Sequence, residues 1–242
     1  MSELAAIIVA AGKSQRMGGV DKQLRTIGGV PVIVRTIAAF EACDDVDAIV
    51  LVVNADNMAG TADLKSKYGW TKVRAFVPGG ERRQDSVLAG LTAVGRLERD
   101  GTSERPRGYE WVAVHDGARP LVTPGLISRG WAAAQGVGAA IAALPATDTI
   151  KATDANHTIT GSPDRNNLWL AQTPQIFRTS LLAGAYTALA EREDPPTITD
   201  CARVVELMGH RVIVFEGEST NIKITTPLDL VIAEAILKSR KS

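Results

Sequence analysis

Short apolar runs alternate with helical patterns along most of this 242-residue chain, and this alternation restricts the fold more than any other feature. The first run, Leu4–Ala10, is continuous and rich in Ile and Val, as expected for a strand buried on both faces of a parallel sheet. Further strand-like runs are Ala48–Val53, Val73–Val77, Trp111–Val114, Ala139–Leu144 and Val212–Phe215. Strands that alternate with helices predict an α/β fold, with right-handed crossovers and a mostly parallel twisted sheet covered by helices on both faces.

Helical patterns occupy the intervals between these runs. The clearest is Ser86–Arg99, in which Val87, Leu91 and Val94 fall on one face. The others are Val32–Phe40, Gly125–Gln135, Thr179–Ala190, Asp200–Met208 and Pro227–Lys238. These segments are predicted to cover the sheet.

One stretch, residues 148–165, departs from the alternation. The β-forming residues Thr149 and Ile150 on one side, and Ile159 and Thr160 on the other, flank a turn-rich DANH segment, which predicts a β-hairpin. Because no helix separates the two strands, we expect the hairpin to stand off the main sheet as an arm. Nothing else indicates a second domain, so the whole chain, 1–242, is predicted to be one domain with this arm.

Charge and cysteine usage restrict the function. The chain holds 27 Lys plus Arg and 27 Asp plus Glu, and a neutral balance argues against nucleic-acid or membrane-surface partners. A local basic cluster would still suffice for a small anionic ligand. Cys43 and Cys201 lack metal-ligand spacing and are expected to be isolated thiols in a reducing compartment. Because the N-terminus also lacks the basic region of a signal peptide, we expect a cytoplasmic protein.

The strongest functional signal is the loop that follows the first strand. Its small residues are Ala10, Ala11, Gly12 and Ser14. Small residues at this place let backbone N–H groups approach phosphate oxygens. Arg16 and Lys22 add positive charge, which a transferring phosphoryl group requires. The alternative is a tight turn with two solvated cations.

Two common nucleotide-binding loops are excluded. Gly12-Lys13-Ser14 imitates the end of a P-loop, but Ala6–Ala11 contains no earlier glycine. The G-x-G-x-x-G pattern is also absent, which excludes a dinucleotide-dependent reductase.

A second candidate segment, Gly79–Ser86, lies between a strand and a helix. Its glycines would let the backbone reach a flat base edge, and Ser86 offers a hydroxyl to that base. The alternative is a glycine turn in which Asp85 or Ser86 caps the helix.

A third segment, Val114–Pro120, follows another strand. Ligands of open α/β sheets bind beyond the carboxyl ends of strands. Asp116 is therefore a candidate for a ribose hydroxyl, an acceptor hydroxyl or a hydrated metal, and Arg119 is a candidate for a phosphate. A surface Asp–Arg pair is the alternative. Lys223, between Ile222 and Ile224, would face away from the apolar side of its strand and toward a ligand, unless it is a solvated charge.

In order along the chain, the motifs are AAGKSQRM, DKQL, GGERRQDSV, VHDGARP, DTIK, AQTPQ and NIKIT. They resemble those of the 2-C-methyl-D-erythritol 4-phosphate cytidylyltransferases, enzymes of the non-mevalonate isoprenoid pathway. The resemblance implies a Rossmann-like nucleotidyltransferase fold with a protruding β-arm, a homodimer, and the use of CTP with a divalent metal, usually Mg²⁺. The implied reaction releases pyrophosphate and forms the CDP-linked methylerythritol.

The resemblance also implies residue roles. The catalytic residues would be Arg16, Lys22, Arg165 and Lys223. The nucleotide would contact Ala10, Ala11, Gly12, Ser14, Gly80, Glu81, Ser86, Asp116 and Gly117. The acceptor would contact Asp116, Arg119, Thr149, Arg165, Thr173 and Lys223. In the family the arm contributes to the partner's site, so Thr149 and Arg165 would act across the dimer. The chain departs from the family's usual residues at Ser14, Glu81 and Cys201.

Two alternatives remain open. The first is the same reaction on ribitol 5-phosphate or another sugar-alcohol phosphate, because related cytidylyltransferases share most motifs. The second is a catalytically silent nucleotide-binding protein. Retention of Arg16, Lys22, Arg165 and Lys223 argues against it, because a binding protein needs no clamp for an acceptor.

Overall fold

The computed structural model describes residues 3–12, 23–98 and 108–240, except 195 and 197, and its centre is a seven-stranded sheet. The strand order is β11-β7-β10-β6-β1-β4-β5. The strands are β1 (Leu4–Val9), β4 (Val46–Val53), β5 (Val73–Pro78), β6 (Trp111–Asp116), β7 (Ala139–Pro145), β10 (Trp169–Arg178) and β11 (Ile213–Glu216). β10 runs antiparallel to both of its neighbours, and the other pairings are parallel. The predicted α/β class with a mostly parallel sheet is confirmed.

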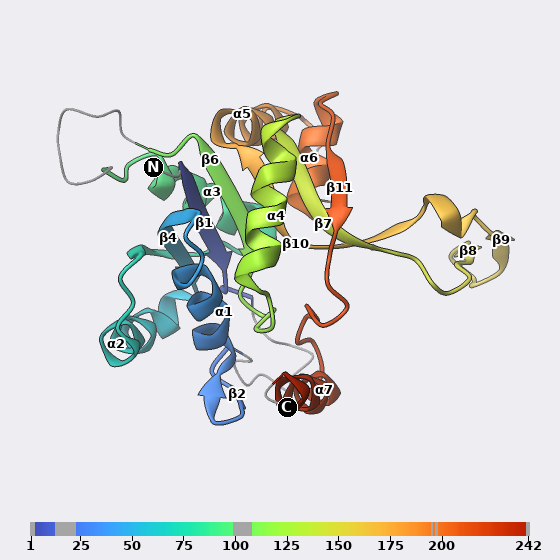
Figure 1. Cartoon of the computed structure of the whole chain (residues 1–242). Helices are drawn as coiled ribbons and strands as arrows, with labels where there is room; N and C mark the ends of the chain where they lie inside the picture. The colour runs from blue at the N-terminus through green and yellow to red at the C-terminus, as the bar shows by residue number, and fades with distance from the viewer. Residues whose placement is uncertain (1–2, 13–22, 99–107, 195, 197, 241–242) are drawn as a thin grey trace.

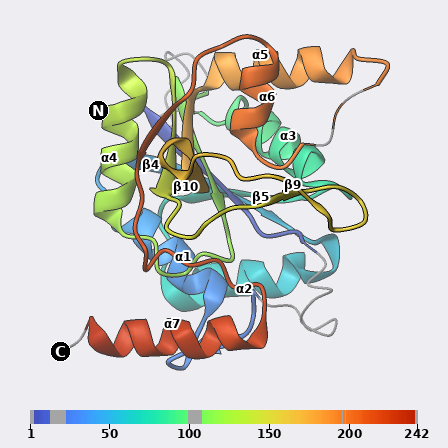
Figure 2. The ribbon, with the colours of Figure 1, turned by 90° about the vertical axis from the view of Figure 1, so that its right-hand side faces the viewer.

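Helices cover both faces of the sheet (Figures 1 and 2). They are α1 (Val32–Glu41), α2 (Met58–Tyr68), α3 (Arg83–Val94), α4 (Pro124–Gln135), α5 (Thr179–Ala190), α6 (Cys201–Leu207) and α7 (Pro227–Ser239). Side chains of β1 alternate between the two cores, as a strand buried on both sides requires. Leu4, Ala6 and Ile8 pack on the face of α1 and α4, whereas Ala5 and Ile7 pack on the face of α3, α5 and α6.

Strand β10 of the main sheet and helix α2 were not predicted, nor was the short two-stranded ladder that packs with α7. β10 contains Gln172, Thr173, Pro174 and Gln175, so it shows no apolar run, although Gln172 to Phe177 are all buried. Helix α2 was not predicted, because it buries only Thr61 and has no apolar stripe. The predicted helix Ser86–Arg99 begins at Arg83 and ends at Val94.

Helix α7 forms a small separate layer below the sheet. It packs with the two-stranded ladder of β2 (Thr26–Ile27) and β3 (Val30–Pro31). The shared core contains Ile27, Val32, Leu121, Ile224 and Ala233. This layer anchors the segment just before α7, which carries Lys223.

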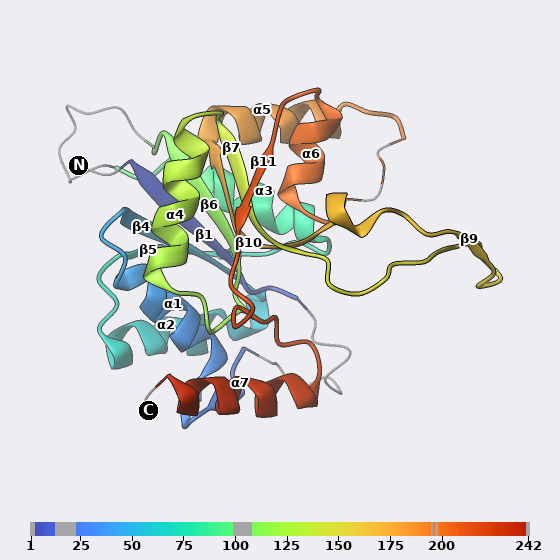
Figure 3. The same ribbon diagram turned by 45° about the vertical axis from the view of Figure 1, so that its right-hand side comes forward.

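The predicted hairpin exists and projects away from the sheet (Figures 1 and 3). It pairs β8 (Ala152–Thr153) with β9 (Ile159–Gly161) in antiparallel fashion. Its turn is built on Asp154, whose carboxylate accepts the N–H groups of Asn156 and Thr158, both at 2.9 Å. Thr149 and Ile150 precede the first strand and do not form it, so that strand begins later than predicted.

Among the described residues, no helix combines the length and apolar character needed to cross a bilayer.

Candidate active site

The loops after β1, β5 and β6 meet at the carboxyl ends of these strands. The N–H of Gly117 donates to the carbonyl of Val9 at 2.9 Å, and the N–H of Gly79 donates to Val53 at 2.8 Å. A Cβ on Gly79 would lie 2.2 Å from the Cβ of Ala11, and one on Gly117 would lie 3.0 Å from that of Ala10. The small residues predicted for phosphate access therefore also allow these three loops to approach one another.

The segment after β5 places its predicted base-contacting residues differently. Gly80 and Glu81 are exposed, whereas Ser86 is buried and its hydroxyl donates to the carbonyl of Arg82 at 3.4 Å. The start of α3 is capped by Asp85, whose carboxylate accepts the Arg82 N–H at 3.1 Å. The alternative interpretation placed Asp85 or Ser86 at the N-cap, before the first residue of the helix. In the structure Asp85 is the third residue of α3 and caps the helix from there. Gly80 must be small, because a Cβ there would lie 2.4 Å from that of Asp85.

Three cations surround the carboxylate of Asp116, the last residue of β6. Lys223 Nζ lies 2.9 Å from Oδ2, Arg119 Nε lies 3.5 Å from the same oxygen, and an Arg83 guanidinium nitrogen lies 3.6 Å from Oδ1. Lys223 and Arg119 were predicted site residues, whereas Arg83 was not. We call these four residues the Asp116 cluster; it holds one anion and three cations.

The charge state of Asp116 follows from this cluster. Burial alone would raise the pKa of its carboxyl group, but the attraction of Lys223, Arg83 and Arg119 holds that pKa well below its usual value. Asp116 is therefore ionised throughout the physiological range, and the cluster retains an excess of two positive charges.

His115 contacts Arg119 and Thr173 beside the cluster and is not placed to act as a base. Its ring is fully buried against Phe40, and burial lowers its pKa to about 3. One ring nitrogen, Nε2, lies 3.4 Å from the carbonyl of Arg119, which can only accept, so Nε2 carries the proton. Nδ1 then accepts from the hydroxyl of Thr173 at 3.0 Å. His115 is neutral, with both nitrogens engaged.

Thr173 and Asn221 tie the cluster to β10. The Thr173 hydroxyl also accepts the backbone N–H of Asp116 at 3.1 Å. Asn221 donates to the carbonyl of Thr173 at 2.8 Å and accepts from Arg119 at 2.7 Å through its own carbonyl. The Thr173 hydroxyl thus both donates and accepts a hydrogen bond inside the protein. Its predicted contact with the acceptor substrate stays a prediction.

The arm residues lie apart from the cluster. Arg165 opens a short 3₁₀ turn, Arg165–Asn167, at the base of the arm, and it donates to the carbonyl of Thr147 at 2.9 Å. Thr149 is exposed. Within the described part of the chain, neither side chain has a hydrogen bond or ion pair to Asp116, Arg119 or Lys223.

Three predicted residues, Ser14, Arg16 and Lys22, lie outside the described residues. For Gly12, at the edge of this gap, no atom of the described residues apart from its chain neighbours lies within 4 Å of where a Cβ would stand.

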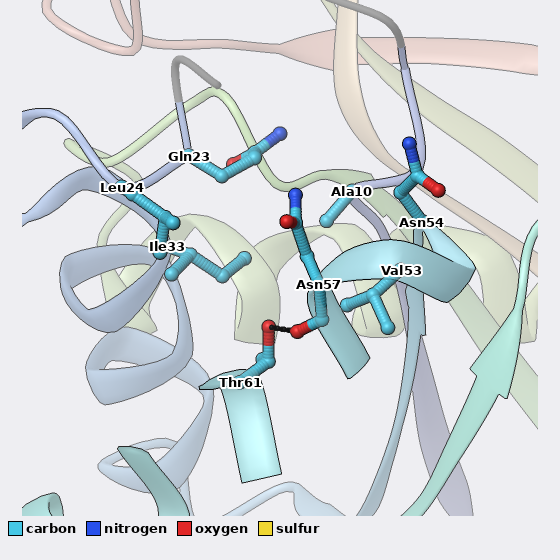
Figure 4. A pocket seen from close by; sticks show the side chains of 8 residues that line it. All are labelled: Ala10, Gln23, Leu24, Ile33, Val53, Asn54, Asn57 and Thr61. Atoms are coloured by element: carbon cyan, nitrogen blue, oxygen red, sulfur yellow. Dashed lines mark hydrogen bonds between the residues drawn. The ribbon is translucent and has the colours of Figure 1, made fainter. Parts of the chain in front are cut away.

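A small pocket adjoins the same strand ends (Figure 4). It is lined by Ala10, Gln23, Leu24, Ile33, Val53, Asn54, Asn57 and Thr61. Three of these residues carry carboxamides, and Thr61 donates to the carbonyl of Asn57 at 2.7 Å. Sequence patterns did not indicate this pocket, because its lining comes from four separate segments.

The described residues do not form a protein-built metal cage. No group of three or more His, Cys, Asp or Glu side chains is arranged among them to hold an ion. Asp116 was the candidate ligand, and cations already face both of its oxygens. A site of this kind does not fit Mg²⁺, which prefers several oxygen ligands.

Comparison with known proteins decides the family. The model of the IspD family, 2-C-methyl-D-erythritol 4-phosphate cytidylyltransferase, matches residues 4–239. The chain belongs to the 2-C-methyl-D-erythritol 4-phosphate cytidylyltransferase family. Curated relatives carry that name in Alkaliphilus oremlandii and Dehalococcoides mccartyi. The first is 41% identical over 100% of this chain and 98% of the relative. The second is 41% identical over 98% of this chain and 96% of the relative.

Solved structures of cytidylyltransferases agree. A crystal structure of 4-diphosphocytidyl-2C-methyl-D-erythritol synthase from Anaerococcus prevotii is 30% identical, with a TM-score of 0.81 over 98% of this chain and 96% of that one. The Thermus thermophilus 2-C-methyl-D-erythritol 4-phosphate cytidylyltransferase is 30% identical, with a TM-score of 0.71 over 96% and 98% of the two chains. The family predicted from the motifs and its fold are both confirmed.

Proposed function

We propose that this chain transfers CMP from CTP to 2-C-methyl-D-erythritol 4-phosphate, releasing pyrophosphate and forming 4-diphosphocytidyl-2-C-methyl-D-erythritol. The observation that carries the proposal is the family match over residues 4–239. The product is a precursor in non-mevalonate isoprenoid synthesis.

The charge of the Asp116 cluster supports a phosphate ligand. Lys223, Arg119 and Arg83 share a single carboxylate within 3.6 Å, and Arg83 lowers the pKa of the Arg119 guanidinium by repulsion, after the larger effect of burial. An incoming phosphate dianion would neutralise the excess charge and would receive charge-assisted hydrogen bonds. A neutral ligand would leave the repulsion in place.

The transfer itself needs little acid–base assistance. A phosphate oxygen of the acceptor is already anionic at neutral pH, and it attacks the α-phosphorus of CTP. One P–O bond forms while the bond to the β-phosphate oxygen breaks, and pyrophosphate leaves with that electron pair. The obstacle is the approach of two anions, so positioning and fixed positive charge supply most of the acceleration. The neutral, enclosed His115 is consistent with this mechanism, because no base is required of it.

The residue roles are proposals that extend from the resemblance. Arg16 and Lys22 would stabilise the α-phosphate, and Lys223 and Arg165 would hold the acceptor phosphate. The cytidine would lie over Gly80, Glu81, Ser86 and Gly117, and its phosphates over Ala10, Ala11, Gly12 and Ser14. Mg²⁺ would be held mainly through the phosphates of CTP, because Asp116 is already surrounded by cations.

The assembly is proposed to be a homodimer in which the arm reaches the partner subunit. Every residue from 151 to 160 is exposed, including Ile159, and the base of the arm exposes Trp169 and Leu170. A lone two-stranded hairpin is marginally stable in water, so a second subunit is a suitable cover. Thr149 and Arg165 would then complete the partner's site. The cytoplasmic location, based partly on two isolated thiols, stays a prediction.

The proposal is tested by measuring pyrophosphate release with CTP, UTP, ATP and GTP, each with 2-C-methyl-D-erythritol 4-phosphate or ribitol 5-phosphate. We expect turnover with CTP and the methylerythritol phosphate to exceed every other pair. Equal or faster turnover with a purine nucleotide would overturn the cytosine assignment. Preference for ribitol 5-phosphate would support the alternative acceptor. No release with any pair would favour the silent binding protein.

A further inference from the structure

Arg83 joins the GGERRQDSV segment to the Asp116 cluster, although it was not among the predicted site residues. It is the first residue of α3, and its side chain is only 22% exposed. One guanidinium nitrogen lies 3.6 Å from Asp116 Oδ1, and the other donates to Cys201 Sγ at 3.3 Å. Its two partners therefore come from β6 and α6, far apart in the sequence.

The cations occupy different sides of the Asp116 carboxylate. Arg83 faces Oδ1, whereas Lys223 and Arg119 face Oδ2. The Lys223 side chain is 40% exposed, against 11% for Arg119, so Lys223 is the cation that an entering ligand meets. To bind a phosphate, Lys223 must share or release Oδ2. Arg83 and Arg119 then remain to hold the carboxylate in place.

Cys201 holds the second guanidinium nitrogen of Arg83. The thiol is fully buried, and its residue is fixed by a 3.0 Å hydrogen bond from its N–H to Gln175 Oε1. Gln175 is fixed in turn by Asp200 at 2.9 Å. Among the described residues, Asp116 is the one carboxylate paired with Arg83. A carboxylate at position 201 would compete for the same guanidinium group.

We propose that Arg83 is a positioning residue for the transfer reaction. It holds Asp116 from the Oδ1 side, so that Lys223 can exchange Asp116 for the acceptor phosphate. The sulfur of Cys201 accepts from the second guanidinium nitrogen and so fixes Arg83 beside Asp116. This inference rests on the proposed function, because it concerns the acceptor phosphate of that reaction.

The test measures KM for each substrate and kcat in Arg83→Gln, Arg83→Lys, Cys201→Asp and Cys201→Ser. Without Arg83, Lys223 is bound more tightly to Asp116, so Arg83→Gln should raise the acceptor KM about tenfold and change the CTP KM much less. Arg83→Lys should restore part of the loss. Cys201→Asp should reproduce the rise, and the neutral Cys201→Ser should stay close to the unaltered protein.

The control is Arg203→Gln, which removes an equal charge from α6 beside Cys201 but pairs only with Glu206 among the described ion pairs. Melting temperatures verify folding; if Arg83→Gln does not fold, Arg83→Lys and Cys201→Asp decide the matter. An unaltered protein without turnover overturns the proposed function and this inference together. An active protein whose Arg83→Gln and Cys201→Asp variants keep the original acceptor KM, or change both KM values equally, overturns the inference alone.

Discussion

The Asp116 cluster and the arm are built in opposite ways, although both are proposed to hold the acceptor phosphate. Asp116 and Arg119 of the cluster are buried, and hydrogen bonds join them to buried Thr173 and Asn221, which links β6, β10 and the segment before α7. In the arm, every residue from 151 to 160 is exposed. The side chains of the cluster are thus held in place by other residues of the same chain, whereas those of the arm are exposed to solvent. The difference indicates that packing within the chain fixes the cluster, whereas the arm needs a contact outside its own chain to be fixed.

The largest expected effect is that of Lys223→Ala. This substitution removes the most exposed cation of the cluster, and loss of a charge-assisted contact to a phosphate costs roughly 1.5–3 kcal/mol or more. We expect kcat/KM for the acceptor to fall about 10- to 150-fold, with the deficit greatest at low acceptor concentration. Steady-state kinetics with the acceptor varied would measure it. Unchanged acceptor kinetics would remove Lys223 from the site.

Arg165→Ala should give a comparable or somewhat smaller loss of turnover, with no change in thermal stability. The side chain is exposed, and it donates a hydrogen bond to the carbonyl of Thr147. Surface substitutions of this kind usually change stability by less than about 0.5 kcal/mol. Kinetics and a melting curve on the same sample would separate the two effects. A lowered melting temperature with normal acceptor kinetics would make Arg165 a structural residue of the arm.

The last effect concerns acid stability instead of turnover, and it distinguishes the two regions directly. The pKa of buried His115 is lowered to about 3 from an ordinary 6.5, so the unfolded chain binds a proton that the folded chain does not. Stability from this group is complete above the unfolded pKa and is lost as the pH falls toward the folded one. We expect His115→Asn to flatten the dependence of unfolding free energy on pH between about 6.5 and 3, by up to about 1.4 kcal/mol per pH unit.

The matched control is His157→Asn on the arm, where the backbone has a positive φ that Asn tolerates. His157 is exposed, so the same substitution there removes an imidazole from the surface instead of from the core. Denaturant titrations at several pH values would supply the free energies. Equal slopes in the unaltered protein and His115→Asn would contradict the buried, neutral assignment of His115.

Sequence patterns predicted the elements whose apolar periodicity is strong. The buried run Leu4–Ala10 became the interior strand β1, and the hairpin was predicted because DANH separates two β-forming pairs. Strand β10 was missed because its interior residues, such as Gln172 and Gln175, are polar and are satisfied by distant partners. A local sequence pattern does not reveal hydrogen bonds between residues that come together only on folding.

The same limit applies to the site. Asp116 and Arg119 were selected because they end or follow a strand, and Lys223 because its run was expected to form one. Lys223 lies outside the strands, yet the fold brings all three together. Sequence patterns did not indicate a role for Arg83, because its partners, Asp116 and Cys201, are distant in the sequence. Thr173 was assigned to the acceptor, and its hydroxyl lies between His115 and Asp116. Pair contacts of this kind depend on the three-dimensional arrangement.

The central claim, that a cluster from one chain and an arm from another form a single site, is tested most directly by mixing two inactive variants. Lys223→Ala and Arg165→Ala chains are combined under conditions of subunit exchange, and pyrophosphate release is followed. If Arg165 acts across the dimer, each hybrid has one site with both lesions and one with neither. Random exchange should then recover about a quarter of the unaltered activity. A sample that demonstrably contains hybrid dimers and yet stays inactive would contradict the shared site.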